Sequence, residues 1–145
     1  MLRDPSLIPL SHQHHNGLAL CVLTERSLSE DSSEANIAKL ARKAIDRYEL
    51  ELTNHFEIEE QILFPASTSP LIPGLIADHR ELEAMIARLR VEPSSGALMD
   101  FTALLRRHIR REENELFEHI QREVSRETLD SLGREIDAKV VRICL

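Results

Sequence analysis

Apolar side chains recur every three or four positions along most of this chain, which is the spacing of an amphipathic α-helix. The pattern predicts four long helices over residues 11–29, 33–64, 73–90 and 97–122, and a shorter amphipathic segment over residues 125–143. Prolines and short polar stretches separate these segments. Because short connections make consecutive helices antiparallel, we expect an all-α, up-down-up-down four-helix bundle with an additional C-terminal helix.

The composition agrees with one compact unit. A length of 145 residues with 42% hydrophobic content suits a single domain over residues 1–145. The net charge of −7 is made of interspersed acidic and basic residues, so we expect no nucleic-acid partner. The start of the chain lacks an apolar signal segment, and no stretch approaches the roughly 20 apolar residues that span a bilayer, so we expect no membrane partner and a cytoplasmic location.

A ten-residue motif occurs twice in the predicted helices. The segment from His55 to Phe64 and the segment from His108 to Phe117 share the pattern HxxxEExxLF. Histidine and phenylalanine are uncommon residues, so we interpret the two segments as an internal repeat. The repeat predicts a bundle with an approximate twofold axis.

Each copy of the repeat places a histidine and a glutamate one turn apart on a single helix face. His55 and Glu59 lie about 40° apart around the helix axis. The same face carries the apolar stripe Ile37, Ala41, Ala44, Tyr48, Leu52 and Ile62. His108 and Glu112 continue a matching stripe of Leu98, Phe101, Leu105 and Leu116. Both polar pairs are therefore expected in the core of the bundle.

The other two helices each offer a further inward histidine. His79 precedes Leu82, Ile86 and Leu89 at helical spacing. The first helix carries His12, His14 and His15, and the series His15, Leu18, Val22 matches the series that starts at His79. We therefore favour His15 as the inward residue, with His14 as the alternative.

Six polar side chains from four helices would then meet in the core, where they cost several kcal/mol each unless a cation compensates them. The predicted metal ligands are His15 or His14, His55, Glu59, His79, His108 and Glu112. Imidazole and carboxylate donors suit iron, manganese or zinc. Two octahedral ions bridged by both glutamates would keep roughly four positions for external ligands. A bundle whose charged residues all lie on solvated faces is the competing interpretation.

This arrangement resembles the hemerythrin-like HHE cation-binding family. The similarity rests on HxxxE in two helices, on Asp78-His79-Arg80-Glu81-Leu82, and on His14-His15-Asn16-Gly17-Leu18. It implies a four-helix bundle around a carboxylate-bridged di-iron centre. Oxygen-carrying members have a second histidine where this chain has Glu83, which argues against oxygen carriage of the usual kind and leaves open whether Glu83 is a ligand. Their last carboxylate would correspond to Glu113, whereas the internal repeat selects Glu112.

We expect these residues to bind metal, most specifically two carboxylate-bridged iron ions. Zinc or manganese would also be compatible with this ligand set. Such a protein would bind or sense O2, NO or peroxide, or handle iron. One alternative is a di-iron oxidoreductase acting on peroxide or dioxygen, assisted by Tyr48 or Glu83. Another is a zinc-filled structural or interaction module. A second copy or another protein is a candidate partner for the C-terminal helix.

Overall fold

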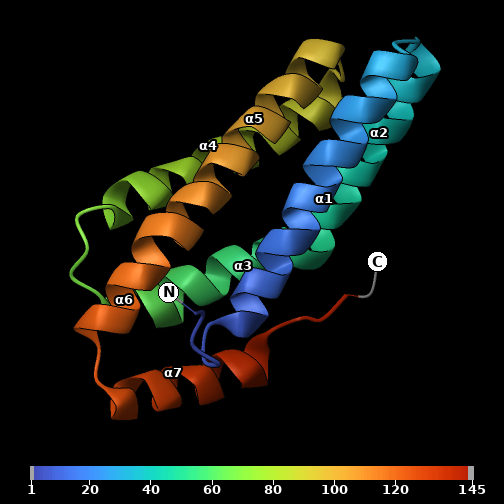
Figure 1. Ribbon diagram of the computed structural model, residues 1–145. Helices are drawn as coiled ribbons and strands as arrows, with labels where there is room; N and C mark the ends of the chain where they lie inside the picture. Colours follow the sequence, from blue (N-terminus) through green and yellow to red (C-terminus); the bar gives the residue numbers. More distant parts are fainter. Residues whose placement is uncertain (1, 144–145) are drawn as a thin grey trace.

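The structure, a computed structural model, describes residues 2–143 and consists of helices with short connections (Figure 1). The elements in chain order are α1 (Ile8–Glu30), α2 (Glu34–Arg47), η1 (Tyr48–Leu52), α3 (Thr53–Ile58), η2 (Glu59–Leu63), η3 (Phe64–Ala66), α4 (Ile72–Val91), α5 (Ser95–Arg111), η4 (Glu112–Leu116), α6 (Phe117–Glu123) and α7 (Arg126–Lys139). The segments from α2 to η3 continue one another as a single long helix, and so do those from α5 to α6. The predicted all-α bundle with an additional C-terminal helix is confirmed.

Serine side chains define the starts of three helices. Ser33, Ser94 and Ser125 each have extended backbone and accept a hydrogen bond from the backbone N–H three residues later. Such caps satisfy one of the amide groups that a helix leaves unpaired at its N-terminus. They place the helix starts close to the positions that the polar stretches predict.

The four long helices form a closed bundle. α1 packs against α2 and α5, and α4 packs against the same two helices. α7 crosses the end of the bundle near the N-terminus and contacts α3 and η2 (Figure 1). Gly133 permits this close crossing, since a Cβ atom there would lie 2.9 Å from the Cβ atom of Ser6. Within residues 2–143, none of the helices is both long and apolar enough to cross a bilayer.

The core consists of two apolar clusters at different levels of the bundle. One contains side chains of α1, α2, α4 and α5, among them Leu20, Leu82 and Phe101. The other joins the N-terminal segment, η2, α6 and α7, and includes Leu10 and Phe117. Along each long helix, a stretch with buried histidine or glutamate lies between the residues of the two clusters. The bundle therefore has a polar layer between two apolar ones.

Three π-helical turns interrupt the long helices. In the second and third of these, the backbone carbonyls of Glu59 and Glu112 accept from the N–H of Phe64 and Phe117, five residues on. The extra residue in each π turn changes which side chains of the following segment face the core. Leu63 and Phe64 are consequently buried, whereas Ile62, which the helical stripe places inward, is only half-buried. The first π turn begins at Tyr48, which is also half-buried.

The expected register of the first helix is wrong by one residue. His14 is buried, whereas His15 is exposed and Val22 is 40% exposed. The inward positions that follow His14 are Gly17 and Cys21, both small. A Cβ atom on Gly17 would lie 2.9 Å from Cδ1 of Ile109, so α1 approaches α5 closely there. An apolar pattern does not mark such small inward residues.

Cysteine contributes little to the architecture. Cys21 belongs to the first apolar cluster, and its thiol lies 3.6 Å from the backbone oxygen of Thr102. Burial raises the pKa of this thiol to about 12, so it stays protonated at neutral pH. Cys144 lies outside the described residues.

Candidate metal centre

The polar layer contains four imidazoles and two carboxylates, contributed by all four long helices. The exposed fractions of these side chains lie between 0% and 3%. They are His14 on α1, His55 on α3, Glu59 at the start of η2, His79 on α4, His108 on α5 and Glu112 at the start of η4. Burying so many ionisable groups costs free energy unless opposite charges compensate them. Their convergence therefore indicates that a compensating charge binds here.

These side chains form two groups that could each hold one metal ion. The first, which we call the α1-side position, contains His14, His55 and both glutamates. The second, the α4-side position, contains His79, His108 and the same two glutamates. In each group the candidate ligand atoms all lie within 4.8 Å of one another. Glu59 and Glu112 are thus placed to bridge two ions.

The Nε2 atoms of the four histidines point toward the shared carboxylates. His14 Nε2 lies 2.8 Å from Oε1 of Glu112, and His79 Nε2 lies 3.0 Å from Oε1 of Glu59. The distances from His55 Nε2 to Glu59 Oε2 and from His108 Nε2 to Glu112 Oε1 are both 3.3 Å. Nitrogen and oxygen atoms from all four long helices therefore meet at one place.

Several of these atoms have no hydrogen-bond partner among the described residues. They are Nε2 of His55, Nε2 of His108, Oε2 of Glu59 and Oε2 of Glu112. Buried polar atoms are nearly always satisfied, so four orphans in one cluster call for a missing partner. All four are atoms of the kind that bind metal ions in proteins. The residues present therefore fit a bound pair of cations.

The Nδ1 atom of each histidine is held from the opposite side. His14 contacts Glu113 at 2.6 Å, and His79 contacts Glu60 at 2.7 Å. His55 donates to the amide oxygen of Gln13 at 2.8 Å. His108 donates to Asp78 at 3.0 Å. Such outer partners fix the tautomer that leaves Nε2 free to bind a metal.

Without a cation, the two central carboxyl groups cannot both ionise easily. Burial, together with the charge of Glu112, raises the pKa of Glu59 well above its usual range. Burial acts in the same direction on Glu112, yet the charge of His108 and hydrogen bonds from the histidines hold its pKa well below normal. Burial and the charge of His108 also lower the pKa of His79 to about 3. These shifts favour a protonated Glu59 beside an ionised Glu112, and a bound cation would replace that proton.

Aromatic rings cover the histidines and follow the internal repeat. Phe64 stacks on His79 with a centroid distance of 5.8 Å, and Phe117 stacks on His14 at 5.3 Å. Phe56, which belongs to the first apolar cluster, also stacks on His79, with a centroid distance of 4.0 Å. These rings exclude water and restrict the rotation of the imidazoles.

Other residues considered from the sequence lie elsewhere. His15 is exposed on α1 and belongs to neither group. Glu83 pairs with Arg80 at 3.1 Å rather than joining the centre. Tyr48 lines a surface hollow that also contains Glu83. Glu113 is an outer partner of His14, and Glu112 is the carboxylate found in both groups.

The outer partners of the histidines are not among the residues that the sequence predicts for the site. Glu60 and Glu113 occupy equivalent positions in the two copies of the motif, and this correspondence was the available signal. Gln13 and Asp78 each stand one position before an inward histidine. Their contacts link residues 42 and 30 positions apart, so no local pattern reveals them.

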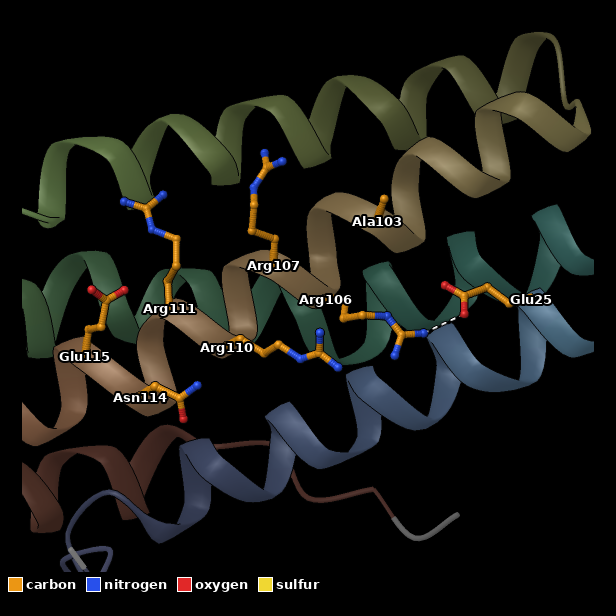
Figure 2. Close-up of a pocket in the computed structure, with 8 residues that line it drawn as sticks. All are labelled: Glu25, Ala103, Arg106, Arg107, Arg110, Arg111, Asn114 and Glu115. Carbon is orange, nitrogen blue, oxygen red and sulfur yellow. Dashed lines mark hydrogen bonds and ion pairs between the residues drawn. The ribbon is translucent and has the colours of Figure 1, made fainter.

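A separate hollow of about 570 Å³ lies on the outer face of α5 and does not include the centre (Figure 2). Four arginines line it, together with Glu25, Ala103, Asn114 and Glu115. Arg106 and Arg110 extend toward α1, where Arg106 pairs with Glu25 at 2.5 Å, whereas Arg107 and Arg111 extend toward α4. The guanidinium groups thus do not converge on one point.

Comparison with known proteins agrees with this geometry. The model of the hemerythrin HHE cation binding domain matches residues 7–120, a range that contains all six side chains of the centre. Searches of curated proteins and of solved structures found no match. The matched range covers most of the chain and carries the two-position cluster of histidines and glutamates, so this protein belongs to the hemerythrin HHE cation-binding family and is a metal-binding helical protein.

Proposed function

We propose that this protein binds two iron ions bridged by Glu59 and Glu112, and that the pair binds or senses a small molecule such as O2, NO or peroxide. The observation that carries the proposal is that two four-residue groups share both glutamates. Two carboxylates between two groups of imidazoles form a ligand set for a pair of ions rather than for one.

The donor chemistry supports iron. Imidazole and carboxylate ligands suit iron, manganese and zinc, whereas soft ions prefer sulfur ligands. Each position offers two imidazoles and two carboxylates, which is fewer ligands than an octahedral ion accepts. Bound iron would supply redox chemistry and open coordination positions. The protein's own residues hold the imidazoles in place, exclude bulk water and carry the two negative charges that face the ions.

Burial of the centre supports a small external ligand. Glu59, His79 and Glu112 are each 0% exposed, and apolar clusters lie on both sides of the layer. A bulky substrate would have to displace core side chains, whereas a diatomic molecule or peroxide requires little space. The burial of the centre therefore favours a diatomic molecule or peroxide as the external ligand.

The test is to load the metal-free protein with Fe(II) under anaerobic conditions and then expose it to air. We expect two irons per chain and near-ultraviolet absorption from a bridged ferric pair. Replacing His55 or His108 by alanine should remove the absorption, because either substitution leaves one of the two metal positions with a single imidazole. Circular dichroism would show whether the variants keep their helices, and an unchanged spectrum in both folded variants contradicts the assignment.

The neighbouring residues His14 and His15 supply a matched control. His14→Ala should lower the iron content and the absorption, since His14 is buried in the α1-side position. His15→Ala should leave both unchanged, because His15 is exposed on the same helix turn. A protein that takes up only zinc, without the ferric absorption, refutes the iron pair, and rapid peroxide turnover contradicts a role limited to binding or sensing.

A further inference from the structure

The centre and its surroundings follow the internal repeat with an approximate twofold relation. Corresponding residues make corresponding contacts on the two sides. The pairs are His14 and His79, His55 and His108, Glu59 and Glu112, Glu60 and Glu113, and Phe64 and Phe117. On geometry alone, the α1-side and α4-side positions would be nearly equivalent.

One pair of hydrogen-bond partners breaks this relation. His55 donates to Gln13, a neutral amide, whereas His108 donates to Asp78, a carboxyl group. The amide of Gln13 is oriented by its own donor contacts, since Nε2 lies 3.0 Å from both Asn54 Oδ1 and the backbone oxygen of Val141. Its oxygen therefore faces His55. The α1-side position has one carboxylate among its outer partners, and the α4-side position has two.

Hydrogen bonds to charged groups are stronger than those between neutral groups, and a carboxylate behind an imidazole makes the opposite ring nitrogen a better metal ligand. We propose that Asp78 acts through His108 to make the α4-side position the tighter of the two, so that the first cation to bind occupies His79 and His108. The inference rests on the proposed function, because it requires that the centre holds two cations. Asp78 is in this sense a positioning residue.

Arg111 moderates this effect. Its guanidinium lies 3.5 Å from the same Oδ2 atom of Asp78 that accepts from His108, and its side chain is 33% exposed. Figure 2 shows Arg111 extending from α5 toward α4, on which Asp78 lies. The positive charge of Arg111 weakens the attraction between the Asp78 carboxylate and the imidazole proton of His108. Removal of Arg111 should therefore strengthen the α4-side position or leave it unchanged.

The experiment is a titration of the metal-free full-length protein with Zn²⁺ against a competing chelator, which resolves two successive dissociation constants. Asp78→Asn keeps an acceptor oxygen for His108 and makes the two sides alike. It should weaken the first binding step about tenfold, within the range known for outer partners of metal ligands. Glu113→Gln alters the α1-side position and should weaken the second step while leaving the first unchanged.

Arg111→Gln separates an electrostatic role from a structural one. The first step should keep or gain affinity in this variant, whereas a loss as large as that of Asp78→Asn would mean that the Asp78–Arg111 contact merely supports the fold and would overturn the inference. Loss of the first step in Glu113→Gln but not in Asp78→Asn would also overturn it. Wild-type protein that binds fewer than two ions would instead refute the proposed ion pair, so the two failures are distinguishable.

Discussion

At the scale of single residues, the centre depends on contacts behind each ligand as much as on the ligands themselves. Each imidazole uses Nδ1 for an outer partner and presents Nε2 to the two carboxylates. Rotating one ring would break a hydrogen bond in a buried environment, where an unsatisfied group costs about 1–3 kcal/mol. The outer partners thus fix the positions of the candidate ligand atoms.

Glu59 offers the sharpest test at this scale. In the metal-free protein, burial and the charge of Glu112 raise the pKa of the Glu59 carboxyl group, which favours the protonated form. Glu59→Gln should therefore leave the melting temperature of the metal-free protein nearly unchanged, since an amide replaces a neutral acid of similar shape. The variant should bind no more than one cation, because a neutral amide is a poor bridge.

Thermal unfolding with and without metal measures both effects. The wild type gains RT ln(1 + [L]/Kd) from a ligand that binds only the folded state, about 2.7 kcal/mol at a hundredfold excess over Kd. We expect a clearly smaller gain in Glu59→Gln. An undiminished gain, or a large drop in stability of the metal-free variant, would argue against a bridging role.

At the scale of helices, two local features set where the ligands point. The π turns that begin at Glu59 and Glu112 let Leu63, Phe64, Leu116 and Phe117 all pack inward. The close approach of α1 to α5 at Gly17 brings His14 within reach of Glu112. The geometry of the centre is thus coupled to backbone irregularities and helix spacing.

The variant Gly17→Leu tests this coupling, because Leu82 occupies the corresponding position after His79. A leucine side chain would meet Ile109 and Leu105, which already lie within 4 Å of a Cβ atom placed there. Overpacking of this kind costs roughly 1–3 kcal/mol. We expect a lower free energy of unfolding in urea and weaker cation binding at the α1-side position. Equal stability and affinity would show that α1 tolerates displacement from α5.

At the scale of the whole molecule, α7 lies below the bundle and packs against the N-terminal segment (Figure 1). Arg126 on α7 pairs with Asp4 at 2.5 Å, and Asp4 also accepts from Ser6. Side-chain hydrogen bonds, chiefly from Arg126, hold the pKa of Asp4 well below its usual range. Because the side chain of Arg126 is 59% exposed, solvent screening keeps the contribution of this ion pair to stability small.

This ion pair predicts a pH-dependent contribution to stability. A carboxyl group with a lowered pKa stabilises the folded state above the ordinary aspartate pKa of about 4 and loses that contribution as the pH falls below it. In the metal-free protein, Asp4→Asn should be less stable than the wild type at pH 7 in urea unfolding. The difference should shrink at pH 3, and an equal difference at both values would refute the assignment.

Local patterns in the amino-acid sequence were enough to predict the four-helix bundle, the internal repeat and the inward orientation of His55, Glu59, His108 and Glu112. Helical periodicity is a local property, so it can be read from residues three or four apart. The repeat added a second, independent indication, because each copy supports the interpretation of the other.

Packing between helices sets which histidine of α1 faces the core and which groups form hydrogen bonds to Nδ1 of each imidazole. His14 is inward because Gly17 and Cys21 allow α1 to lie close to α5, and small side chains leave no apolar stripe to detect. The contacts of His55 with Gln13 and of His108 with Asp78 join different helices, whose relative placement depends on packing over the whole bundle. For the same reason, the difference between the two metal positions becomes apparent only in the folded chain.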